Sequence, residues 1–289
     1  LVNRTILSLV NRIILRLLML TLFHNAVSTC SQKVRWMLSE KQMEFTSREI
    51  DLLAGEQHAD WYTKIHPDHV VPALLDDETV ILESSLIMMY LDQIGSGDPL
   101  VPNDPLAAHR MRSWTHLIDH KIHAEAAVIT FALGPRHLVN AQPAETREAA
   151  IASIVDPVAR AQRRSVLEHG VEAPEFKTAI ERFIKMLDDM ETQLQDAQWL
   201  AGAAPTIADG AVLPYVLRLE HLGLDSMFAG YPAVTAWLAR MKQRPSFASA
   251  VEQWIPDEVI TFLKQMAPGD QEALQQLFHE IETTKKDAS

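Results

Sequence analysis

A change in hydrophobic pattern at a segment rich in glycine and proline constrains the fold of this chain most strongly. The segment runs from Gly95 to Pro99, and Pro102 and Pro105 follow it. Before it, the apolar residues switch repeatedly between strand and helix spacing; after it, they keep helical spacing. A chain of 289 residues is long enough for about two domains. The pattern therefore predicts an α/β domain followed by an all-α domain.

The region before this segment is predicted to alternate strands and helices. Its apolar runs predict strands at residues 20–23, 45–50, 71–75 and 79–82, and helices at residues 31–41, 57–65 and 84–94. The order is therefore β-α-β, then α, then β-β-α. Because a β-α-β crossover is almost always right-handed, we expect the first two strands to form a parallel pair flanked by helices.

The region after the segment is predicted to be helical. The expected helices span residues 106–131, 145–168, 174–194, 206–222 and 232–244, with a short terminal helix at 274–281. In the third of these, the apolar residues recur at the spacing of a buried helix face. We expect Pro214 to kink the fourth helix and the polar residues from Thr283 onward to fray.

Charge and cysteine content exclude several classes of protein. The chain has 26 basic and 38 acidic residues, a net charge of −12, which argues against a general nucleic-acid binder. Its single cysteine, Cys30, excludes a disulfide framework and a cysteine-based zinc site. We therefore expect a cytoplasmic protein with no nucleic-acid partner.

Residues 1–18 form a basic leader of uncertain status. They contain Arg4, Arg12 and Arg16, have no acidic residue, and begin with the near-repeat LVNRTILS-LVNRIILR. Three interpretations stay open: a membrane-surface helix, a signal peptide, or upstream sequence joined to a protein that starts at Met19. The apolar stretch from Ile13 to Phe23 is too short for a membrane span and contains Arg16. Membrane contact is expected only if this extension belongs to the protein.

The segment between the first strand and the first helix is a candidate anion site. It contains Ser28, Thr29 and Cys30, small residues placed where a helix presents unpaired N–H groups and its positive dipole end. Such a position stabilises an anion, including a thiolate. The competing interpretation is that Ser28 or Ser31 only caps the helix.

Two further loops suggest a ligand with the shape of a peptide. A cis bond between Val71 and Pro72, at the start of a strand, would turn the Val71 backbone toward an extended ligand. Ser84 opens a helix, so its hydroxyl and N–H suit a carboxylate, while Glu83 suits an ammonium group. A ligand with a thiol, a peptide bond and an amino-acid head would satisfy all three loops.

These motifs resemble a known family. The segments STCSQKVR, EQHADWYTKIHP, VVPALL and ESS resemble the thioredoxin-like half of the glutathione transferases, and residues 199–209 resemble the signature of their helical half. The resemblance covers about residues 19–255. It implies a thioredoxin-like glutathione-binding domain at 19–95, a helical substrate domain at 104–255 and a C-terminal tail at 256–289. The S-x-C motif looks like the zeta class. The EQHADWYTKIHP block, with the helical insertion around 140–175, looks like bacterial etherases acting on lignin aryl ethers.

The resemblance implies roles for individual residues. Ser28 would donate a hydrogen bond to the glutathione sulfur and hold it as a thiolate. Cys30 is the alternative catalytic residue, as a nucleophile in thiol-disulfide exchange. The remaining implied contacts are Thr29 beside the sulfur, Gln57 and His58 at the glycyl end, Val71 and Pro72 along the cysteinyl part, and Glu83 and Ser84 at the γ-glutamyl head.

The function implied is that of a detoxifying glutathione transferase. Glutathione is expected as co-substrate, without a metal, and its thiolate would attack a small hydrophobic or aromatic electrophile, with a lignin-type aryl ether as one candidate. We expect a homodimer whose electrophile binds between the domains, near residues 106–131 and Trp254. A glutathione-dependent isomerase, a Cys30 exchange enzyme, and a noncatalytic glutathione-binding or membrane-surface protein stay open.

Three histidines could form either a metal site or a polar helix face. His116, His120 and His123 fall at helical spacing, with Asp119 nearby. No HExxH motif or paired cysteine accompanies them. We therefore expect a polar face that lines a cleft or a subunit contact.

Overall fold

The computed structural model describes residues 20–154, 156–265 and 270–287. The expectations for residues 1–18 and for a start at Met19 lie outside these residues. The chain forms two compact units. Of the described residues, unit 1 contains 20–115, 197–214 and 237–256, and unit 2 contains 116–154, 156–196, 215–236, 257–265 and 270–287. Within the described residues, no helix combines the length and apolar character needed to cross a lipid bilayer.

The first part of unit 1 is an α/β region. Its elements are β1 (Leu20–His24), α2 (Thr29–Glu40), β2 (Thr46–Glu49), η1 (Glu56–His58), α3 (Asp60–Thr63), β3 (Ala73–Asp76), β4 (Thr79–Ile81), α4 (Ser84–Ile94) and the greater part of α5 (Pro105–Leu117). The strands form one sheet in the order β2-β1-β3-β4. β1 and β2 are parallel, which confirms the predicted pair, and the other neighbours are antiparallel.

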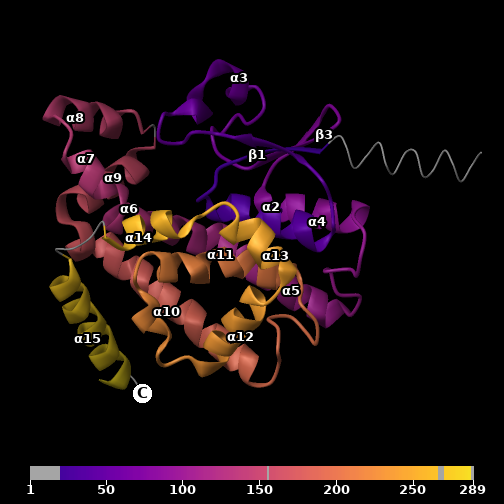
Figure 1. Ribbon diagram of the computed structural model, residues 1–289. Coiled ribbons are helices and arrows are strands. Elements are labelled where there is room, and N and C mark those ends of the chain that lie inside the picture. Colours follow the sequence, from indigo (N-terminus) through magenta and orange to yellow (C-terminus); the bar gives the residue numbers. More distant parts are fainter. Residues whose placement is uncertain (1–19, 155, 266–269, 288–289) are drawn as a thin grey trace, which may run out of the picture. The chain divides into compact units, whose positions relative to one another are not determined.

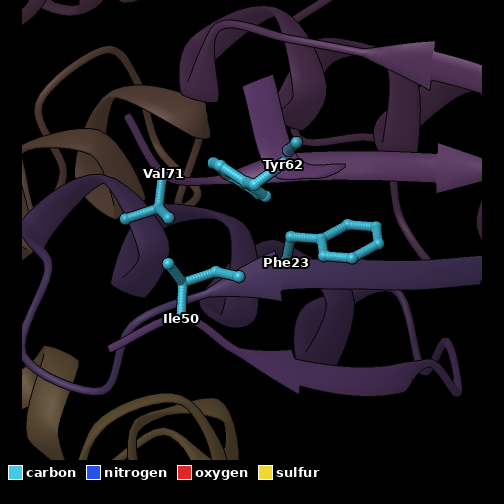
Figure 2. Packing of buried hydrophobic residues seen from close by; sticks show 5 residues of the cluster. Phe23, Ile50, Tyr62 and Val71 are labelled. Carbon is cyan, nitrogen blue, oxygen red and sulfur yellow. The ribbon is translucent and has the colours of Figure 1, made fainter. Parts of the chain in front are cut away.

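Helices cover both faces of this sheet. In Figure 1, α2 and α4 lie together on one side of the strands and α3 lies on the other. The side chains of β1 alternate between the two faces. Phe23 points to the α3 side, where it packs with Ile50, Tyr62, Val71 and Ala73 in a buried cluster (Figure 2). Leu20, Leu22 and His24 therefore point toward α2 and α4.

The rest of the chain is helical, as predicted. Its elements are η2 (Ile118–Ile122), α6 (His123–Leu133), α7 (Pro135–Asn140), α8 (Ala144–Ala152), α9 (Pro157–His169), η3 (Gly170–Glu172), α10 (Pro174–Gln195), α11 (Ile207–His221), η4 (Asp225–Phe228), α12 (Pro232–Lys242), α13 (Pro245–Phe247), η5 (Ala248–Glu252), α14 (Asp257–Gln265) and α15 (Gln271–Asp287). The buried stripe predicted on α10 is confirmed, with Ile180, Phe183, Leu187 and Met190 fully enclosed.

Some expected helices are divided. The single helix expected at 145–168 is two helices, because Asp156 caps a new helix that begins at Pro157. The Asp156 carboxylate accepts from the N–H groups of Val158 at 2.7 Å and Ala159 at 3.0 Å. A capping aspartate followed by proline is a helix start signal, so this break was readable from the sequence.

Two further differences concern the helix expected at 106–131 and the chain end. The first is interrupted by η2, a π-helical turn that separates α5 from α6. The terminal helix expected at 274–281 is longer, since the backbone of α15 is helical from Gln271 to Asp287. α11 is helical on both sides of Pro214.

Candidate functional site

The register of the sheet brings the predicted site loops to one edge. At the end of β1, Phe23 pairs with Ala73 and His24 pairs with Glu49. The loop after β1, the loop after β2 and the residues before β3 therefore share this edge. β4 is antiparallel to β3, so the turn after Ile81 returns to it as well. All four segments that carry predicted site residues lie there.

Ser28 is the N-cap of α2. Its backbone is extended, with φ −65° and ψ 124°, and its Oγ accepts from the N–H of Ser31 at 3.2 Å. The capping interpretation is therefore confirmed. It does not exclude a second role, because a hydroxyl that accepts one hydrogen bond keeps its own hydrogen to donate. Ser28 is half-buried, so that hydrogen can meet a ligand at the helix end.

The start of α2 favours an anion. Thr29 is buried and Cys30 is half-buried in the first turn, and this turn contains no acidic side chain. The first N–H groups of a helix lack partners within the helix and carry its positive dipole end. A thiolate placed beside Ser28 would therefore be stabilised by both the hydroxyl and the helix end.

The Val71–Pro72 bond is cis, the geometry on which the sequence argument for this loop depended. The Val71 side chain belongs to the buried cluster on the α3 side of the sheet. Its backbone lies just before β3, and within the described residues its N–H and C=O have no hydrogen-bond partner. An extended peptide could add to this edge through those two groups.

Glu83 and Ser84 occupy the turn between β4 and α4. Glu83 has φ +66° and ψ 107°, a conformation that residues other than glycine rarely adopt and that often occurs at functional sites. Ser84 is the first residue of α4 and is buried, and the first turn of α4 has no acidic side chain. The turn thus presents an exposed carboxylate beside a helix N-terminus.

A buried lysine supports this turn. Lys33 of α2 is fully enclosed, and its Nζ donates to Ser85 Oγ at 2.8 Å. This bond ties the start of α4 to α2 and places the lysine ammonium group beside Ser85, in the first turn of α4. Lys33 was not among the predicted site residues, because the burial that it shares with every residue from Ser31 to Leu38 is visible only in the structure.

Gln57 and His58 lie in η1, at the same edge. Gln57 Nε2 lies 3.2 Å from His58 Nε2, and His58 Nδ1 lies 3.1 Å from His69 Nδ1. Gln57 Oε1 is buried without a partner among the described residues. An amide carries both a donor and an acceptor, so this side chain can bond one end of a ligand.

His66 is a buried residue near this group that sequence reasoning missed. It is 2% exposed, its Nδ1 has no partner among the described residues, and its ring stacks on Tyr62. Burial lowers the pKa of His66, against the opposite effects of Asp68 and Glu83. The neutral ring therefore adds hydrogen-bonding capacity without adding charge.

Residues expected outside the loops lie as follows. Trp254 is half-buried in unit 1, where its ring packs edge-on against His24 at 4.7 Å. His116 and His120 have ring centroids 4.3 Å apart, whereas His123 Nδ1 lies 3.0 Å from the hydroxyl of Tyr215. In the described part of the chain, no three histidine, cysteine or acidic side chains gather as a metal site.

Unit 2 contains a cavity of about 550 Å³. Its walls come from α10, from η4 with the residues that follow it, and from α15. None of the predicted site residues lines it, so it is separate from the loops described above.

Two family models match the chain. The model described as "Glutathione S-transferase, N-terminal domain" matches residues 27–94, and the model described as "Glutathione S-transferase, C-terminal domain" matches residues 146–240. Together they span more than half of the chain and include both of its predicted halves.

Individual proteins are similar over most of the chain. Protein LigF of Sphingobium sp. is 29% identical over 75% of this chain and 86% of its own length. Glutathione S-transferase PARB of Nicotiana tabacum is 25% identical, over 78% and 94%. The tetrachloro-p-hydroquinone reductive dehalogenase of Sphingobium chlorophenolicum is 24% identical, over 80% and 94%. The crystal structure of the Sphingobium beta-etherase LigF has a TM-score of 0.72, with 26% identity, over 81% of this chain and 99% of that one.

Proposed function

This chain belongs to the glutathione S-transferase family, an enzyme family that uses glutathione as co-substrate, and we propose that its Ser28 holds the glutathione thiolate for attack on a small aromatic electrophile. The observation that carries the proposal is the state of the Ser28 hydroxyl. It accepts from Ser31 N–H at the positive end of α2, so its own hydrogen stays available to donate to a ligand.

The free energy of one such hydrogen bond is large enough to hold glutathione as a thiolate. A free thiol titrates near 8.5, so only a few per cent is thiolate at neutral pH. A hydrogen bond to an ion contributes about 1.5–3 kcal/mol, and each pKa unit corresponds to about 1.4 kcal/mol. One serine hydroxyl can therefore lower the thiol pKa by about one to two units, which raises the thiolate fraction greatly. Ser28 acts as a stabiliser and not as a base.

The remaining loops would hold the rest of glutathione. Thr29, in the first turn of α2, would lie beside the sulfur. Gln57 and His58 would bind the glycyl end, and Val71, before cis Pro72, would pair its backbone with the cysteinyl part. Glu83 and Ser84 would receive the γ-glutamyl head, with Glu83 facing its ammonium group and the start of α4 facing its carboxylate. The Lys33 bond to Ser85 supports this last assignment.

An aryl ether is the substrate class that the relatives favour. One relative is named a beta-etherase and another a reductive dehalogenase of a chlorinated hydroquinone, so both names refer to aromatic chemistry or ether cleavage. In an ether cleavage, the thiolate would form a C–S bond to the ether carbon. The C–O bond would break, and the aryloxide would leave and take a proton from solvent.

We propose that residues 19–95 bind glutathione and that residues 104–255 supply the electrophile site, followed by a tail at 256–289.

Cys30 carries a second candidate function. It lies in the first turn of α2, half-buried, where the helix end lowers a thiol pKa. As a nucleophile it would form a mixed disulfide with glutathione and release a thiol from a disulfide substrate. This function needs Cys30 and not Ser28, so the two candidates are separable by mutation.

We also propose a cytoplasmic homodimer, as is usual in the family. The acidic net charge of −12 suits a protein without a nucleic-acid partner. Light scattering should give twice the chain mass of 32.5 kDa. A monomer at micromolar concentration would contradict the dimer.

The test compares Ser28→Ala with Cys30→Ala on an aryl halide and on a panel of aryl ethers. We expect Ser28→Ala to lower kcat/KM by about 10- to 100-fold near neutral pH, the loss of one charge-assisted hydrogen bond. Cys30→Ala should keep most of the activity. Loss of activity in Cys30→Ala alone would favour the exchange enzyme, and glutathione binding without turnover of any electrophile would contradict both candidates.

A further inference from the structure

Arg35 lies at the centre of a buried network next to the Ser28 loop. It is on α2, two turns after Ser28, and is 2% exposed. Its guanidinium donates from Nη1 to the carbonyl of Asn25 at 3.0 Å, from Nη2 to the carbonyl of Ala26 at 2.8 Å, and from Nε to the carbonyl of Ala250 at 2.8 Å. Three backbone carbonyls from two distant segments thus converge on one side chain.

The acceptors of this buried cation are unusual, since a buried charge is normally paired with an opposite charge. Among the described residues, its hydrogen bonds go to backbone carbonyls and to an imidazole, and its Cζ lies 5.2 Å from the ring centre of Trp254. Burial lowers the pKa of Arg35 to about 9, with Glu49 acting in the opposite direction, so the group stays cationic at neutral pH. A guanidinium with five donors suits such a set of carbonyls.

His24 completes the network on the strand side. Arginine can only donate, so His24 Nδ1, 3.1 Å from Arg35 Nη1, must accept. The proton is therefore on Nε2, which donates to Ser47 Oγ at 2.8 Å. Burial lowers the pKa of His24 to about 3, with Arg35 adding to the effect, so the ring is neutral. The guanidinium thereby holds the loop after β1 and His24 of β1 directly. It holds β2 through the bond from His24 to Ser47.

One carbonyl links this network directly to Ser28. The carbonyl of Asn25 accepts from Arg35 and also from the backbone N–H of Ser28 at 3.3 Å. Asn25 is held further by its own N–H, which donates to Ser31 Oγ at 3.2 Å, and by its side-chain amide, which donates to the carbonyl of Ile50 at 3.0 Å. The position of the Ser28 backbone therefore depends on an oxygen that Arg35 holds.

We propose that Arg35 is a positioning residue for the reaction: it clamps the Asn25–Ala26 carbonyls to the segment from Ala248 to Trp254 and so fixes the Ser28 hydroxyl where the glutathione sulfur binds. This inference rests on the proposed function. Arg35 acts through Ser28 and touches no reacting atom.

A merely structural role would also lower stability, so the test needs a matched control. Lys41, the C-cap of α2, is a second cation that is 2% exposed. Its Nζ donates to Asp92 Oδ1 at 3.1 Å and to the carbonyl of Asp98 at 3.0 Å, and within the described residues no side-chain hydrogen bond joins Lys41 to the Ser28 loop. Lys41→Met removes a buried cation from the same helix without releasing the loop.

The experiment measures the pKa of enzyme-bound glutathione from the ultraviolet absorbance of its thiolate in the wild type, Arg35→Met, Arg35→Lys and Lys41→Met. We expect Arg35→Met to raise this pKa by about one unit, a tenfold loss of thiolate, and to lower kcat more than it changes KM. Arg35→Lys should give an intermediate value, since lysine keeps the charge but cannot bridge both segments. Lys41→Met should lower the melting temperature and leave the thiolate pKa unchanged.

A double mutant tests the route through Ser28. In a Ser28→Ala background, Arg35→Met should cause no further rise in the thiolate pKa, because the group that it positions is gone. Wild-type thiolate pKa values in both Arg35 variants would overturn the inference, as would equal shifts in Lys41→Met. If Arg35→Met does not fold, Arg35→Lys decides. A wild-type enzyme that binds no glutathione would instead contradict the proposed function itself.

Discussion

Two helices of this protein, α2 in unit 1 and α10 in unit 2, are buried for different purposes. α2 is enclosed from Ser31 to Leu38, and its buried residues include Gln32, Lys33 and Arg35, whose polar groups bond loops of the candidate site. α10 fully buries only apolar residues, and its charged residues are half-buried or exposed. α10 therefore stabilises the protein through apolar packing, whereas the buried hydrogen bonds made by α2 fix the geometry of the loops.

The substitution with the largest expected effect on stability creates a cavity beside α10. Phe183 is fully buried, so Phe183→Ala should lower the free energy of unfolding by about 3–5 kcal/mol. Denaturant unfolding measures the loss. The thiolate pKa of bound glutathione, measured on the folded fraction, should not change, and a shift similar to that of Ser28→Ala would break the distinction between the two helices.

A substitution at Gly210, which packs against Trp36 of α2, should change stability less than Phe183→Ala does. Its effect should be opposite in sign to the usual effect of a glycine-to-alanine change in a helix. Gly210 lies inside α11, where alanine normally stabilises a helix by about 1 kcal/mol. A Cβ at this position would lie 2.1 Å from Cε3 of Trp36, a buried residue of α2. We therefore expect Gly210→Ala to destabilise the protein by about 1–3 kcal/mol through overpacking.

Gly202 provides the control for this prediction. Apart from its two chain neighbours, no heavy atom of the described residues lies within 4 Å of a Cβ at this position, so Gly202→Ala should leave stability nearly unchanged. Thermal unfolding of both variants checks the pair. A Gly210→Ala protein at least as stable as the wild type would show that α2 is free to shift.

The third prediction concerns acid sensitivity in unit 1. Burial holds the pKa of His24 near 3, whereas the unfolded side chain titrates near 6.5. Above pH 6.5 both states are neutral and stability is unaffected. As the pH falls from 6.5 toward 3, only the unfolded state gains a proton, so His24 should lower stability by up to about 1.4 kcal/mol per pH unit.

The measurement for His24 is urea unfolding of the wild type and His24→Gln at several pH values between 7 and 4. The wild type should lose stability more steeply than the variant as the pH falls. Parallel curves would mean that His24 does not remain neutral in the folded protein.

The sequence predicted those parts of the fold that depend on local pattern. The strands, α2 and α4 follow from short motifs and spacing, and the structure confirms them. The break at Asp156 was equally local, but the apolar spacing on both sides hid it. The π-helical turn in η2 has no comparable local signal.

The supporting groups of the candidate site could not be read from the sequence. Arg35 and Ala250 are 215 positions apart, and their hydrogen bond depends on where η5 packs. Lys33 reaches Ser85 only because α4 returns beside α2. Both residues looked like exposed charges on a helix. A polar residue within a helix that is buried on every side is recognisable only once its neighbours are known.

The central claim is that the Ser28 hydroxyl holds glutathione as a thiolate. Titration of bound glutathione in wild type and Ser28→Ala, followed by thiolate absorbance, tests it most directly. We expect a wild-type pKa below that of free thiols, which titrate near 8.5, and a rise of about one to two units in Ser28→Ala. Identical titration curves in the two proteins would contradict the claim.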